Sequence, residues 1–166
     1  MSCILVFIPL LVNAELSTRD AWDNLKKLLE TGGYQVIGQE ITVGPDLGIK
    51  NVQISSEVDA QTDITFDIGS LDLTKNKDGF INISLPEEIY VQYLNEDEFG
   101  YKTEANILVR ARELDFKVSG KISQILYQLT ASSAGFVLVE LLDNGVASPD
   151  FSAEMEFVLA LSLIHI

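Results

Sequence analysis

Apolar and polar residues follow two different periods along this chain, and the period changes once. In residues 16–31 apolar side chains recur every three or four positions, at Ala21, Trp22, Leu25, Leu28 and Leu29. This spacing predicts an amphipathic helix. Ser17 or Thr18 can cap its start, Asp20 favours the positive end of its dipole, and Gly32-Gly33 is a stop signal. Because a helix of this length is marginal alone, its apolar stripe is expected to pack on a core.

After Gly33 the period is two residues, which is typical of β-strands. The alternating runs predict ten strands, at 34–43, 48–58, 62–74, 79–85, 88–94, 101–111, 113–119, 122–130, 135–142 and 151–159. Many runs are separated by segments rich in Gly, Asn and Asp, at 45–48, 76–79, 95–100 and 143–145. Such segments form tight turns, and short links join antiparallel neighbours, so the strands are predicted to form a meander.

Alternation within several runs assigns one apolar face and one polar face to this sheet. The apolar face is expected to carry Ile64, Phe66, Ile68, Ile81, Ile83, Leu114, Phe116 and Val118. The apolar parity shifts just after Ile68, and Gly69-Ser70 stands at the shift, as expected for a β-bulge that bends the sheet. The predicted fold class is mainly β (α+β): an N-terminal amphipathic helix followed by a long, curved antiparallel meander sheet, half-barrel-like in shape.

The predicted apolar face is larger than the predicted helix. Ten strands about 4.8 Å apart make a sheet roughly 48 Å wide. A helix of about 15 residues is only roughly 22 Å long and 10 Å across. Closure of the sheet, further protein chain, or a bound apolar ligand or partner would have to cover the remainder. The residues of the apolar face are therefore the candidate ligand-binding residues.

Both ends of the chain differ from the part between them. Residues 1–14 hold an uninterrupted apolar run and end on the small residue Ala14, which predicts a signal peptide cleaved before Glu15. The run is shorter than the about 20 residues of a membrane-spanning helix, so no stable membrane span is expected after cleavage. Residues 161–166, LSLIHI, are the translation of a transposase mosaic end used in sequencing libraries, and are expected to be foreign. Residues 15–160 are predicted to be a single, incomplete β-rich domain.

Charge and composition narrow the chemistry. The chain has 25 acidic and 11 basic residues, for a formal net charge of -14. Nucleic acid is therefore not an expected partner, because phosphate binding depends on clustered Lys and Arg. The only histidine, His165, and the only cysteine, Cys3, lie in the two end segments. No catalytic residue, metal site or cofactor is predicted.

Several short segments resemble one family of secreted proteins. They are LSTRDAW at 16–22, Gly33-Tyr34, LTKNKDGFINISLP at 73–86, VSG at 118–120 and YQLTA at 127–131. Together they resemble the secreted alphaproteobacterial domain-of-unknown-function family twenty-one twenty-five. The resemblance covers most of residues 15–160. It implies a periplasmic, sheet-dominated protein longer than this chain, and it brings no catalytic residues.

The sequence thus favours a periplasmic, non-enzymatic binding or scaffolding protein that holds an acyl chain or another apolar partner on the concave face of its sheet. The partner can be an apolar ligand or an envelope protein. Two alternatives stay open. One is a carboxylate-based envelope hydrolase, which would need acidic side chains that converge in a pocket with raised pKa. The other is a purely structural module whose apolar face is covered by a C-terminal part absent from this sequence.

Overall fold

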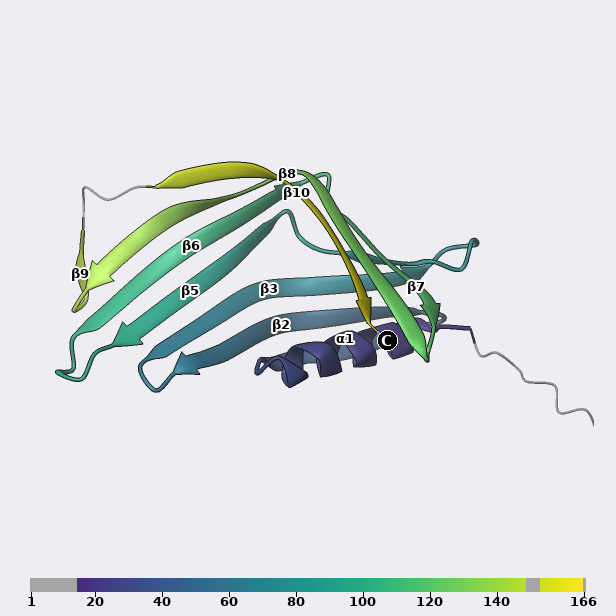
Figure 1. The fold of residues 1–166 in the computed structure, drawn as a ribbon, viewed down its shortest axis with the longest axis horizontal. Coiled ribbons are helices and arrows are strands. Elements are labelled where there is room, and N and C mark those ends of the chain that lie inside the picture. Colours follow the sequence, from purple (N-terminus) through teal and green to yellow (C-terminus); the bar gives the residue numbers. More distant parts are fainter. Residues whose placement is uncertain (1–14, 149–152, 166) are drawn as a thin grey trace, which may run out of the picture.

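The computed structural model describes residues 15–148 and 153–165, which form one helix followed by an antiparallel sheet (Figure 1). The helix is α1 (Thr18–Thr31). The strands are β1 (Gln35–Val43), β2 (Asp46–Asp59), β3 (Thr62–Lys75), β4 (Ile81–Ser84), β5 (Glu88–Glu96), β6 (Lys102–Arg112), β7 (Asp115–Lys121), β8 (Gln124–Asp143), β9 (Val146–Ala147) and β10 (Glu154–His165). This arrangement confirms the mainly β fold class.

The helix begins and ends where the sequence predicts. Ser17 is the N-cap, and its side chain accepts a hydrogen bond from the backbone N–H of Asp20 at 3.1 Å. The Asp20 carboxylate accepts in return from the backbone N–H of Ser17 at 3.1 Å, which completes a capping box. At the other end the chain leaves the helix at Gly32, and Gly33 adopts a φ of 90° that favours glycine.

The sheet is an up-and-down meander in which some of the long strands are interrupted. β3 pairs with β5 over its first part and with β4 over its last part, so β4 and β5 together lie along one edge of β3. At the next position in the sheet, β6 pairs with β5 and β7 pairs with β4. The long strand β8 then pairs with both β6 and β7. β9 and β10 lie on the other edge of β8. The predicted antiparallel meander is therefore confirmed.

The long strands bend at a pair of adjacent irregularities. Asn51 and Gly69 have positive φ angles of 53° and 77°, and the β2–β3 register shifts on both sides of Val52. The predicted bulge at Gly69-Ser70 is thus confirmed, with a partner in β2 that the sequence did not reveal. The bulge changes the parity of the strand, so Ile49 before it and Val52 after it are both 0% exposed.

The predicted strands at 122–130 and 135–142 are in fact a single strand, β8. Ser133 is opposite Arg112, Ala134 is opposite both Ala111 and Phe157, and Ala131 is opposite Leu159, although the β8–β10 register shifts between Phe157 and Leu159. These pairings hold the segment extended, so no turn forms there.

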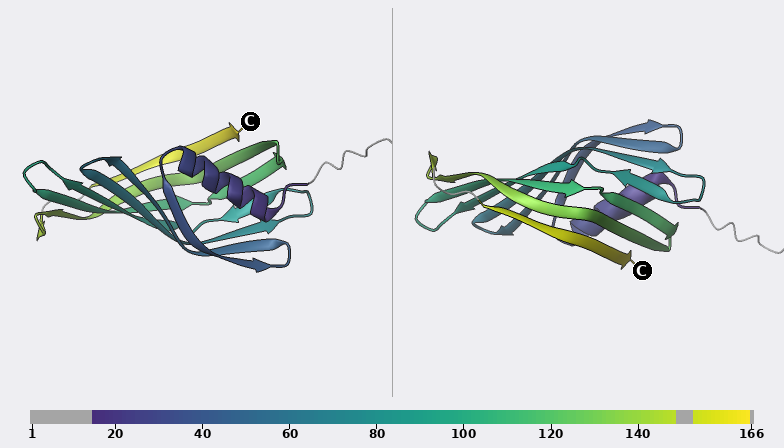
Figure 2. Two further views of the ribbon diagram at one scale, coloured as in Figure 1. Left: turned by 90° about the horizontal axis from the view of Figure 1, so that it is seen from below. Right: turned by 90° about the horizontal axis from the view of Figure 1, so that it is seen from above.

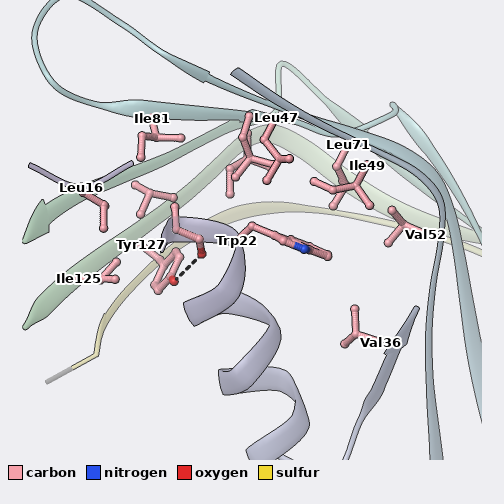
Figure 3. Packing of buried hydrophobic residues seen from close by; sticks show 14 residues of the cluster. Leu16, Trp22, Val36, Leu47, Ile49, Val52, Leu71, Ile81, Ile125 and Tyr127 are labelled. Atoms are coloured by element: carbon pink, nitrogen blue, oxygen red, sulfur yellow. Dashed lines mark hydrogen bonds between the residues drawn. The ribbon is translucent and has the colours of Figure 1, made fainter. Parts of the chain in front are cut away.

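The helix lies beneath one end of the arch formed by the strands (Figures 1 and 2). Its apolar side packs on a cluster of buried residues drawn in Figure 3: Leu16, Ala21, Trp22, Val36, Leu47, Ile49, Val52, Leu71, Leu73, Ile81, Ile83, Val118, Ile125 and Tyr127. The strand residues of this cluster lie on one side of the bend in the sheet or at it, except Val36, which is opposite Ile54 just past the bend. No helix within residues 15–148 and 153–165 has the length and apolar character needed to cross a membrane.

Candidate functional site

The face of the sheet that turns toward α1, here called the inner face, has a covered half and an uncovered half. The covered half consists of the cluster residues beneath the helix. Ile54 lies at the boundary, because it packs against that cluster and is directly opposite Phe66 in β3. Directly opposite residues point to the same side of a sheet. Phe66 therefore belongs to the same inner face, and its row starts at the edge of the covered half, since Val36, opposite Ile54, is part of the buried cluster.

Polar contacts at its sides hold α1 on the covered half. The Trp22 indole Nε1–H donates to Glu40 Oε1 at 3.1 Å, and Arg19 pairs with the same carboxylate at 2.6 Å. From the opposite side of the curled sheet, the Tyr127 hydroxyl donates to Asn24 Oδ1 at 2.8 Å. Burial raises the pKa of Tyr127 to about 12. The helix is thus attached to both β1 and β8.

The uncovered half is made of three cross-strand rows of apolar side chains. They are Ile64–Tyr93–Ala105–Leu141, Phe66–Val91–Ile107–Leu138 and Ile89–Val109–Phe136–Met155. None of these residues belongs to the buried cluster. Val91 and Ala105 are buried, with 8% exposure each, Met155 is 56% exposed, and the others are half-buried. The rows therefore form a partly open apolar surface rather than a fully packed core.

The size of this surface follows from strand geometry. Rows that each cross four strands about 4.8 Å apart, with about 6.6 Å between alternate residues, give a footprint on the order of 19 Å by 20 Å. That is roughly 400 Å², within the 300–600 Å² of the largest patch on an ordinary monomer, which is often functional. The apolar face predicted from the sequence thus exists, but only about half of it is free.

The predicted ligand-binding residues fall into different parts of this face. Those that lie in the covered half, with 0–3% exposure, are Ile81, Ile83 and Val118. Those that are partly buried against the cluster are Ile68 and Phe116. Those that lie in the uncovered half are Ile64 and Phe66. Leu114 is half-buried at the break between β6 and β7.

Sequence reasoning missed the largest part of the uncovered half, which comes from β5, β6 and β8. In these strands apolar residues occupy both parities, as in Ile107-Leu108-Val109, so alternation does not single out a face. Leu108 is only 6% exposed although it lies on the opposite, outer face. Cross-strand register, which the sequence does not supply, was needed to separate the two faces.

The outer face of the same strands is mixed: it carries apolar residues such as Leu108 and Tyr90, which is 58% exposed, as well as paired carboxylates. Glu57 and Asp63 are directly opposite one another in β2 and β3, beside a hollow of about 470 Å³ that is also lined by Ser55, Thr65 and Gln92. Like charges in this position disfavour the pairing unless water solvates them. Within the described part of the chain, no group of three or more His, Cys, Asp or Glu side chains is placed to hold a metal ion.

Carboxyl groups with lowered pKa lie elsewhere. The Lys75 ammonium, which hydrogen-bonds the Glu15 carboxylate at 2.9 Å, lowers the pKa of Glu15. The backbone N–H of Gln61 lowers the pKa of Asp59. Both shifts are opposite to the raised pKa that a catalytic general acid requires.

Comparisons with protein-family models, with curated proteins and with solved structures found no match for this chain.

Proposed function

We propose that this protein is a periplasmic, non-enzymatic binding protein that holds an acyl chain on the uncovered half of its inner face. One observation carries the proposal: the three apolar rows continue the core beyond the end of α1, and all of their residues except Val91 and Ala105 remain at least partly exposed. The periplasmic location rests on the predicted signal peptide at 1–14, which lies outside the described residues. The family resemblance supports the same location.

The two halves of the face support different roles. The covered half is closed by Trp22, Leu25 and Leu29 of α1, so its side chains stabilise the fold. The uncovered half exposes aliphatic and aromatic side chains in rows that lie side by side, so a linear hydrocarbon chain can run across them. Burial of apolar area there would release water without breaking any protein contact.

The affinity expected for an open face is modest. Each methylene group removed from water contributes about 0.8 kcal/mol, and a single myristoyl chain binds even a bilayer with a constant of only about 10⁴ M⁻¹. A dissociation constant on the order of 100 µM is therefore expected for a 14-carbon acyl chain, and shorter chains are expected to bind more weakly.

A titration with a fluorescent monoacylglycerol tests the proposal. The full chain is delipidated and titrated alongside two variants. Phe66→Gln places an amide in the middle row, and Thr65→Gln is the control, because it places the same amide on the outer face of the same strand. Saturable binding by the wild type and the Thr65 variant, with at least a fivefold loss for the Phe66 variant, is the expected result. Circular dichroism checks that both variants fold, since neither residue belongs to the core cluster.

Two results would overturn the proposal. One is no saturable binding by the wild type. The other is an unliganded dimer in analytical ultracentrifugation that Phe66→Gln converts to a monomer, because the apolar rows would then be covered by a second copy of the chain.

A further inference from the structure

We infer that the uncovered half selects a single-chain lipid whose head group is uncharged and bears hydroxyl groups, such as a monoacylglycerol, and discriminates against free fatty acids. This inference rests on the proposed function and names its ligand class. It follows from the charges that the inner face lacks and from a polar row that borders the apolar ones.

No basic side chain lies on the uncovered half. Its three apolar rows contain neither Lys nor Arg. The basic residues of β6 are Lys102, Arg110 and Arg112, and all three have the parity of the outer face. Lys102 and Arg110 are also ion-paired there, with Glu96 at 3.2 Å and Glu88 at 3.0 Å. A carboxylate on the inner face would therefore have no cation to pair with.

The charges near the uncovered half are negative. α1 points its C-terminal end toward this half (Figure 1), and its last turn has no basic residue to offset the negative end of the helix dipole. Lys26 of the helix is paired with Glu30 at 3.9 Å. The chain as a whole carries a formal charge of -14. An anionic head group is thus repelled both locally and at longer range.

A row of polar residues runs alongside the apolar rows, on the side farthest from the bend. Thr62, Asn95, Thr103 and Asp143 are directly opposite one another across β3, β5, β6 and β8, next to the row that contains Ile64. The Asn95 amide Nδ2 donates to Thr62 Oγ1 at 2.9 Å. Thr62 is only 9% exposed and already accepts from Asn95, so the Asn95 amide, the Thr103 hydroxyl and the Asp143 carboxylate are the groups that can bond the hydroxyls of a glycerol-type head. The Asp143 carboxylate accepts from a hydroxyl but repels another carboxylate.

The ligand is therefore oriented. Its head lies over the polar row, and its chain runs across the apolar rows for about 20 Å toward the bend, where Ile54 and Ile68 adjoin the covered half.

Competition by head-group analogues of equal chain length tests the inference. Monodecanoylglycerol, decanoate and decyltrimethylammonium each displace the fluorescent monoacylglycerol from the full chain at pH 8 and low salt. The neutral compound is expected to compete at least tenfold better than decanoate. Equal or better competition by decanoate would overturn the inference, and so would more than tenfold better competition by the cation. Since probe binding itself reports on the acyl site, failure of the head-group preference is distinguishable from failure of the proposed function.

Adjacent serines supply a matched gain-of-function pair. Ser56 lies on the inner face opposite Ile64, whereas Ser55 lies on the outer face opposite Thr65. Ser56→Lys places a cation beside the apolar rows and is expected to strengthen decanoate competition at least fivefold. Ser55→Lys makes the same change in net charge and is expected to leave it within twofold. An equal gain in both variants would contradict the local electrostatic argument.

Discussion

Truncation of one isoleucine in each half of the inner face would measure how differently the two halves are covered. Ile81 is 0% exposed beneath α1, and Ile64 is half-buried in the uncovered half. Ile81→Ala removes three carbon atoms at about 0.8 kcal/mol each and leaves a cavity, so it is expected to cost about 3–4 kcal/mol. Ile64→Ala leaves no closed cavity and removes side-chain area that water already reaches in part. Its expected cost is about 1 kcal/mol, and the loss of strand propensity is common to both variants.

Urea unfolding provides the assay, because the only tryptophan, Trp22, is 3% exposed at the contact between α1 and the sheet. With a slope of about 2 kcal/mol per M, the two variants should differ in unfolding midpoint by about 1 M. Far-ultraviolet circular dichroism should give the same midpoints if unfolding is two-state. Equal destabilisation by the two truncations would mean that the rows around Ile64 are sealed in solution, and the reasoning for a bound ligand would be refuted.

Other predictions concern the elements that hold the fold. An alanine at Gly120, where φ is 106°, would place its Cβ 2.2 Å from a backbone carbonyl oxygen of β8. Gly120→Ala should therefore lower the free energy of unfolding in urea by about 3 kcal/mol. Gly145→Ala, at a φ of 76° with open space around it, should lower it by only about 1 kcal/mol. Tyr127→Phe deletes the hydrogen bond from β8 to α1 and should cost about 1 kcal/mol. In an absorbance titration the same variant should lose the tyrosine that ionises near pH 12. Because the folded-state pKa of Glu15 is lowered below 4.5, its interaction with Lys75 stabilises the fold above that pH and is lost as pH falls through the lowered pKa. Acid unfolding of Glu15→Gln should therefore show a slightly weaker dependence on pH below 4.5, and an unchanged profile would count against the Lys75 contact.

The local elements were predictable because their signals are local. Ser17 and Asp20 form the capping box, and Gly69 adopts the positive φ that a bulge requires. The meander was predictable for the same reason, since short turns such as Asn76 to Gly79 join successive strands. In that turn the backbone N–H of Gly79 donates to the carbonyl of Asn76 at 3.2 Å.

The division of the apolar face was not predictable, because it depends on distant contacts. Alternation marks Ile81 and Ile64 as equivalent, and only the position of α1 along the arch separates them. The sequence predicted two strands in place of β8 for a related reason. The middle of β8 is held in strand conformation by pairing with Arg112 and its neighbours on one side and with β10 on the other. Tertiary pairing overrides local propensity in such a segment.

Methyl-resolved NMR of isoleucine-labelled protein is the most direct test of ligand binding on the uncovered half. Titration with monodecanoylglycerol should shift the methyl signals of Ile64, Ile89 and Ile107, which lie in the three apolar rows. The signals of Ile37 and Ile41, which are 58% and 42% exposed on β1, should not move. Shifts confined to the two β1 residues, or no shifts at a saturating ligand concentration, would contradict the claim that this face receives an acyl chain.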